Sequence, residues 1–152
     1  MDEAAVAQLR TIVAALAAVV AGIHLLHPSQ GGAALLVYAR VGYLGDPRPL
    51  LFTLGAFALV FALVLGSNGF AGRTLYLGGI VVTLAFLGGF LAWHTVFEHG
   101  GLWPYLEPNP HADENVLVVI GWHLLADPLV LVSKVTELAL LGCLVTLYRA
   151  EG

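Results

Sequence analysis

Residues 128–148 read PLVLVSKVTELALLGCLVTLY, an apolar stretch that contains two charged side chains, Lys134 and Glu137. A helix of this length measures about 30 Å, which matches the thickness of a bilayer's hydrocarbon core. A charge at that depth is costly unless it is paired or faces a protected interior. The stretch therefore predicts a helix of a membrane bundle whose interior is polar.

The composition supports the same class of protein. Apolar residues make up 59% of the 152-residue chain and charged residues 11%, and the mean hydropathy is +0.90. A domain of this size cannot hide so much apolar surface in one core, so lipid must cover the remainder. The net charge of −4 and the lack of a basic run exclude a nucleic-acid binder. Cys143 is the only cysteine, which excludes an intramolecular disulfide and a thiolate metal cluster. Arginine outnumbers lysine and Ala, Gly, Val and Leu are abundant, which favours a prokaryotic origin.

The apolar stretches divide the chain into elements of an all-α fold. We expect one membrane domain over residues 1–152, with spans at about 9–27, 49–66, 74–97 and 128–148. The first span is predicted to be a retained helix and not a signal peptide, because acidic Asp2 and Glu3 precede it. Stretches 33–44 and 115–125 are too short to cross and are predicted to be interfacial helices. An outer loop is expected over 98–114.

The order of elements predicts an internal repeat. Each short helix precedes an Asp-Pro step, Asp46-Pro47 or Asp127-Pro128, where the aspartate can cap the next span. The chain therefore reads twice as span, short helix, Asp-Pro and span, with His24 and His94 in matching positions. The alternative is a chance resemblance between the halves.

The basic residues near the span ends predict the orientation. Arg10, Arg73 and Arg149 lie on one side, and Arg40 and Arg48 on the other. By the positive-inside rule we expect a multi-pass protein of the cell membrane with both termini in the cytoplasm. The histidine-bearing ends of the spans would then face outward.

The histidines suggest a cofactor, and three interpretations remain open. In the first, His24 and His94 are the axial ligands of haem b, and Arg40 and Arg48 meet the propionates. In the second, a copper or zinc ion takes its ligands from a set of imidazoles and one carboxylate, namely His24, His27, His94, Glu98, His99 and His123. In the third, the histidines are interfacial and bind nothing.

Other polar residues align with these along the predicted helix faces. Tyr76, Thr83, His94 and Glu98 share one stripe of the third span. In the fourth span Asp127, Lys134 and Glu137 share a face, and Asp127 could orient a ligating imidazole.

Lys134 and Glu137 form either a structural ion pair or part of a proton or ion path that Thr83 and Tyr76 continue. No catalytic motif appears, so we expect at most a redox subunit. The predicted function is electron transfer or metal handling at an outward-facing histidine site. The alternatives are a small ion- or proton-linked transporter and an accessory subunit. The predicted partners are the lipid bilayer and either a second copy of the chain or other subunits of a membrane complex.

Overall fold

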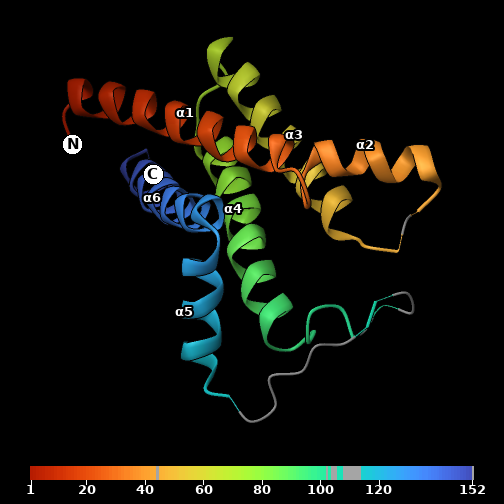
Figure 1. Ribbon diagram of the computed structural model, residues 1–152. Coiled ribbons are helices and arrows are strands. Elements are labelled where there is room, and N and C mark those ends of the chain that lie inside the picture. The colour runs from red at the N-terminus through yellow and green to blue at the C-terminus, as the bar shows by residue number, and fades with distance from the viewer. Residues whose placement is uncertain (44, 102, 104–105, 108–113, 152) are drawn as a thin grey trace.

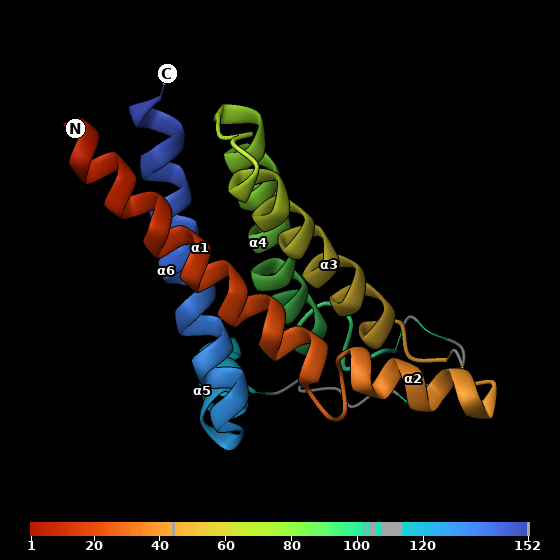
Figure 2. The ribbon, with the colours of Figure 1, turned by 90° about the horizontal axis from the view of Figure 1, so that it is seen from above.

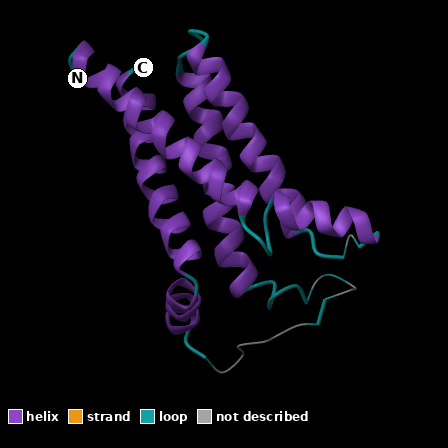
Figure 3. Cartoon of the chain, turned by 45° about the horizontal axis from the view of Figure 1, so that its top comes forward, coloured by secondary structure: helices purple, strands orange, loops and turns teal. Residues whose placement is uncertain are grey.

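The computed structural model describes residues 1–43, 45–101, 103, 106–107 and 114–151. These residues form helices joined by turns and loops, and no strand occurs among them (Figures 1 and 3). The helices are α1 (Glu3–Leu26), α2 (Gly32–Val41), α3 (Arg48–Ser67), α4 (Arg73–His94), α5 (Val116–Ala126) and α6 (Pro128–Ala150). The predicted all-α fold is confirmed.

Four helices, α1, α3, α4 and α6, are long and apolar enough to cross a membrane, with 20 to 24 residues each. They confirm the four predicted spans. Two of their boundaries differ from the prediction by three residues or more. Helix α1 begins at Glu3, because the Asp2 carboxylate accepts the Ala5 N–H at 2.7 Å and caps the first turn. Helix α4 ends at His94, three residues before the predicted end at 97.

The aspartates of the two Asp-Pro steps each accept an amide hydrogen at the start of a span. Asp127 is the predicted N-cap of α6, whereas the N-cap of α3 is Pro47 and Asp46 lies one residue before it. The Asp46 carboxylate accepts the Arg48 N–H at 2.9 Å, and the Asp127 carboxylate accepts the Leu129 N–H at 2.8 Å. Each aspartate thus accepts a hydrogen from an amide at the start of a span, where no carbonyl of an earlier helical turn is available.

The short helices α2 and α5 contain 10 and 11 residues and cannot cross a bilayer. Both lie at the end of the bundle opposite the two termini and the α3–α4 turn (Figure 2). This places the ends of the spans that carry His24 and His94 on the same side as α2 and α5. Their interfacial depth stays a prediction.

The packing repeats between the halves. Helix α1 packs against α2 and α3, α4 packs against α5 and α6, and α1 also lies along α6. Each half therefore joins its two spans and its short helix in the same way. Whether the halves are true duplicates stays a prediction.

The core lies between the spans and consists of small residues on α1 against leucines on α6. Ala17 and Ala21 face Leu140 and Leu144, all at most 6% exposed. In contrast, many large apolar side chains of α3 point outward, for example Leu51, Leu54, Phe57 and Phe61 at 57 to 63% exposure. A row of this kind is explained by contact with lipid.

Candidate functional site

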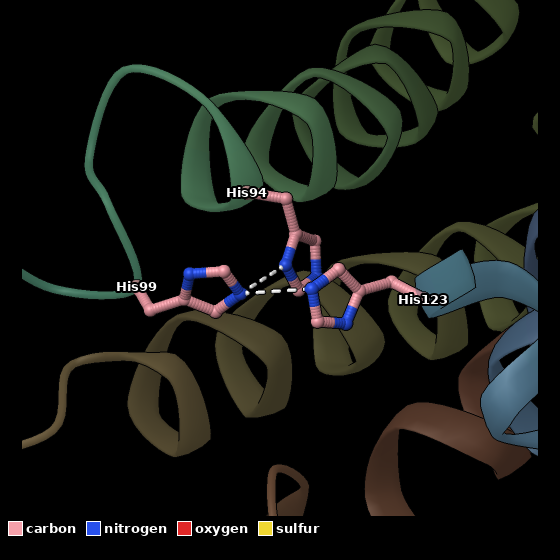
Figure 4. Close-up of side chains that lie close together, drawn as sticks. All are labelled: His94, His99 and His123. Carbon is pink, nitrogen blue, oxygen red and sulfur yellow. Dashed lines mark hydrogen bonds between the residues drawn. The ribbon is translucent and has the colours of Figure 1, made fainter. Parts of the chain in front are cut away.

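Three of the predicted ligands, His94, His99 and His123, come together at the end of the bundle opposite the termini. His94 Nδ1 lies 2.8 Å from His99 Nε2, which lies 3.1 Å from His123 Nε2 (Figure 4). One nitrogen from each ring can be chosen so that all lie within 4.8 Å of one another. The three residues, called the histidine triad below, come from α4, the turn after it and α5.

The turn after α4 positions His99. Glu98 and His99 adopt left-handed backbone angles, with φ of 45° and 60°, and the His99 N–H donates to the Trp93 carbonyl at 2.9 Å. The chain thereby folds back and returns the His99 ring to His94. The predicted continuation of the helix through residue 97 is wrong, and Glu98 therefore does not extend the stripe of His94. Glycines follow His99 directly and favour the end of a helix.

The triad has the donors of a transition-metal site. Imidazole nitrogens suit zinc and copper, and around a tetrahedral ion about 2.0 Å from each ligand the nitrogens stand roughly 3.3 Å apart. The observed 2.8 and 3.1 Å are close to that spacing. The His94 and His123 rings stack with centroids 4.0 Å apart, so ion binding would require them to tilt toward a common point.

Glu98 does not belong to the triad. Its side chain is exposed, and the group of described residues with ligand atoms in mutual reach contains only the three histidines. Of the six predicted ligands, the structure therefore brings three together, namely His94, His99 and His123.

A second polar cluster surrounds the carboxylate of Glu137, which is fully buried. Lys134 Nζ donates to both carboxylate oxygens, at 2.8 and 2.7 Å, and the Ser133 hydroxyl donates at 2.6 Å. His24 Nε2 lies 3.0 Å from the same carboxylate. A carboxylate only accepts, so the Nε2 of His24 carries the hydrogen. The pairing of Lys134 with Glu137 was predicted, whereas the two further donors were not.

His24 is thus engaged away from His94. Its ring stacks on Phe86, with centroids 4.0 Å apart, and lies 4.9 Å from that of Phe52. Axial ligation of haem would require Nε2 to leave Glu137, or the ring to turn over against both phenylalanines. This geometry favours a bare ion at the triad over haem between His24 and His94.

One cavity of about 160 Å³ nevertheless joins histidines from both halves. His24, His27, His94 and His123 all line it, together with Asp127 and Lys134. Cavities that hold organic ligands measure roughly 300–1,000 Å³, so this one suits water or an ion better than a porphyrin. His27 Nε2 is buried there, 3.7 Å from Asp127, and has no hydrogen-bond partner among the described residues.

The arginines assigned to haem propionates have other positions. Arg48 forms an ion pair with Asp46 at 2.7 Å, and its guanidinium lies 4.2 Å from the centre of the Trp93 ring. Arg40 is exposed near the end of α2. Neither observation supports a role in binding propionates.

Of the predicted continuation of a polar path, Thr83 lies in the middle of α4 and Tyr76 lies near its start, toward the termini. Thr83 is fully buried and donates its hydroxyl to the Gly79 carbonyl of its own helix at 2.8 Å. Tyr76 donates to Glu151 at 2.9 Å and accepts from Arg10 at 3.1 Å, at the end of the bundle that holds the termini. Nothing in this arrangement tests the path itself.

Glu151 also binds Arg10 directly, at 2.6 Å. Burial alone would raise the pKa of the Glu151 carboxyl, but the hydrogen bonds from Arg10 and Tyr76 outweigh it and hold that pKa below its usual value.

The predicted outer loop is described only in part. The Trp103 ring lies 5.8 Å from that of Trp93 and 5.5 Å from that of Phe97, so this part of the loop folds back on the end of α4. The loop residues His111, Asp113, Pro104, Tyr105, Pro108 and Pro110 lie outside the described residues.

No family model, curated protein or solved structure matches this chain. The function must therefore be argued from the site.

Proposed function

We propose that this chain is a multi-pass membrane protein that binds a transition-metal ion, zinc or copper, at His94, His99 and His123. The observation that carries the proposal is the convergence of three imidazole nitrogens within 4.8 Å of one another. Three protein ligands leave a fourth position of a tetrahedral ion open, which is typical of sites that exchange a ligand and not of closed structural sites. Metal handling is the role that fits such a site.

Metal binding to the purified protein tests the proposal. We expect one zinc or copper ion per chain in detergent solution, with an X-ray absorption spectrum of imidazole ligation. Exchange of a supporting residue typically lowers metal affinity by about 10–100-fold, and His123→Gln should exceed this because it removes a ligand.

His27→Gln is the matched control. His27 is a buried histidine of the same cavity but not of the triad, so its exchange should leave the affinity within a few-fold of the parent. Equal affinities of the His123→Gln and His27→Gln proteins would refute the assignment.

Haem b with a role in electron transfer is the alternative cofactor. The matching positions of His24 and His94 at the ends of α1 and α4 speak for it, and the contact of His24 with Glu137 speaks against it. A Soret band in the purified protein that disappears in His24→Ala and His94→Ala would establish haem in place of a bare ion.

Ion- or proton-linked transport is a second candidate function, because α6 carries Lys134 and Glu137 in its buried face. Such charges inside a membrane are expensive and commonly mark transport paths. Four spans leave little room for an alternating gate, so we infer that a transporter would act as a homo-oligomer or within a larger complex. An ion flux per folded protein that is lower in Glu137→Gln liposomes than in parent liposomes would favour this function.

The orientation belongs to the same proposal. Arg10, Arg73 and Arg149 lie toward the ends of α1, α4 and α6 that share one end of the bundle with both termini. By the positive-inside rule we infer that this end faces the cytoplasm of a cell-membrane protein. Reporter fusions at the C-terminus test it: cytoplasmic reporters should be active and exported reporters silent.

A further inference from the structure

Helices α1 and α6 run antiparallel in a constant register. Arg10 pairs with Glu151 and His24 pairs with Glu137, so fourteen residues separate the partners on either helix. The His27 ring, just after the end of α1, lies 3.7 Å from the carboxylate of Asp127, which precedes α6. The end of α1 and the start of α6 therefore meet at the same end of the bundle.

The 160 Å³ cavity lies between the end of α1, the end of α4 and the first turns of α6. It extends along the first two turns of α6, from Asp127 to Ser133 and Lys134, and is bounded by the turn after α1 through His27. At the end of the cavity next to the start of α6, the Asp127 side chain is 43% exposed. Ser133, further along the cavity, is 3% exposed. At about 1.5 Å per residue, Lys134 and Glu137 stand roughly 10 and 15 Å below the start of α6, near the middle of a 30 Å core.

At this depth polar side chains line part of the cavity wall, beside the apolar Ile23, Phe52 and Phe90. His24, Ser133 and Lys134 line the inner part, and the buried Nε2 of His27 has no hydrogen-bond partner among the described residues. An unsatisfied buried ring nitrogen costs about 1–3 kcal/mol, and water in a polar cavity of sufficient size removes that cost. The titratable groups around the cavity are His24 and His27 near the end of α1, His94 of α4, His123 of α5 and Asp127, Lys134 and Glu137 of α6.

Beyond Glu137 the buried side chains are apolar apart from that of Thr83, whose hydroxyl is bound to the Gly79 carbonyl of its own helix. The next residues toward the termini, Val20, Ala21, Phe86 and Leu140, are at most 4% exposed and pack together. A separate cavity of about 360 Å³ follows, lined by apolar residues of all four spans apart from Arg10, Thr11, Ser67 and Tyr76 near its end. Apolar cavities do not hold water.

We propose that the 160 Å³ cavity is a water-filled half-channel. It gives water and small cations on the histidine side of the membrane, and not on the opposite side, access to the buried cluster of His24, Lys134 and Glu137. The proposal does not depend on metal binding, since the cavity and the apolar layer below it are present whether or not the triad holds an ion.

Cysteine accessibility in liposomes tests this. The background variant is Cys143→Ala, and the reagent is a small membrane-impermeant cationic methanethiosulfonate added outside. The two reporters are Ser133→Cys, which lines the cavity, and Ala21→Cys, which lies in the apolar layer. Their parent residues are 3% and 2% exposed, so burial alone predicts the same protection for both.

We expect Ser133→Cys to react about tenfold or more faster than Ala21→Cys, because a dry buried thiol stays protonated and unreactive. Two surface cysteines define the sides: Leu117→Cys on α5 at the histidine side and Asn68→Cys in the α3–α4 turn at the other. The labelled fraction of Ser133→Cys should equal that of Leu117→Cys and differ from that of Asn68→Cys.

Equal protection of both buried cysteines would refute the half-channel, and labelling of Ser133→Cys with the Asn68→Cys fraction would refute its sidedness. Val130→Cys, a second cavity-lining position, repeats the test if Ser133→Cys fails to fold. Failure of this experiment leaves the metal proposal standing, and loss of metal binding leaves the labelling result unchanged.

Discussion

Helices α1 and α6 are joined at two levels by charged groups in very different surroundings. At the end that holds the termini, Arg10 meets Glu151 with side chains 46% and 19% exposed. Four turns away His24 and Lys134 meet Glu137, with side-chain exposures of 6%, 10% and 0%. At both levels one carboxylate accepts hydrogen bonds from several donors. We therefore expect their contributions to the free energy of unfolding to differ because of solvent exposure and not because of geometry.

This difference governs what substitutions will do. An exposed pair is screened by water and contributes up to about 1 kcal/mol. A buried pair gains little over apolar residues of similar size, but removing one partner leaves a charge without compensation, at a cost of about 3–5 kcal/mol. The three predictions that follow compare the two levels.

Glu137→Gln should have the largest effect, a loss of about 3–5 kcal/mol in the free energy of unfolding. Glutamine keeps the size of the side chain but leaves the Lys134 ammonium uncompensated. Unfolding by denaturing detergent in mixed micelles measures the loss. The double variant Lys134→Met, Glu137→Gln removes both charges and should recover most of the stability. If it is as unstable as the single variant, the charge of Lys134 is not the cause.

Ser133→Ala should cost about 1.5–3 kcal/mol in the same measurement, because it removes one hydrogen bond to a buried charged group. Thr136→Ala is the control on the same helix. Thr136 is half-buried and donates its hydroxyl to the Val132 carbonyl of its own helix and not to a charged group, so its loss should be much smaller. Equal effects of the two variants would show that the Ser133 hydroxyl does not support Glu137.

Glu151→Gln should have the smallest effect, at most about 1 kcal/mol near neutral pH. Because the folded-state pKa of Glu151 is lowered, its contribution is complete above the unfolded-state value of about 4.3 and is lost as pH falls through the folded-state pKa. The stability difference between parent and variant, measured from pH 3 to 7, should therefore vanish at the acid end. A difference that persists there would exclude the ionised carboxylate as its source.

Much of the fold could be predicted from the sequence, because lipid and backbone hydrogen bonding leave few options to apolar stretches of 20 residues. The hydrogen bonds that Asp46 and Asp127 accept at the span starts were readable for the same reason, since an aspartate before a proline has a local role at a helix start. The pairing of Lys134 with Glu137 followed from their spacing on one helix.

The contacts between residues of different helices could not be predicted in the same way. Which residue of α1 meets Glu137 depends on the register between two helices, and periodicity within one helix does not determine it. Ser133, four residues before Glu137, carried a readable signal because the two share a helix face. The return of His99 to His94 depends on a left-handed turn, and Gly100 and Gly101 were the only hint of it.

The fixed spacing of fourteen residues on both α1 and α6 limits how this protein can vary in length. Deleting one residue between Arg10 and His24 would rotate one end of α1 by about 100° relative to the other, so one of the two contacts with α6 would be lost. Substitutions among the apolar residues between these levels carry no such penalty if volume is kept. We therefore expect homologues to differ in side chains along this segment while insertions and deletions collect in the turns.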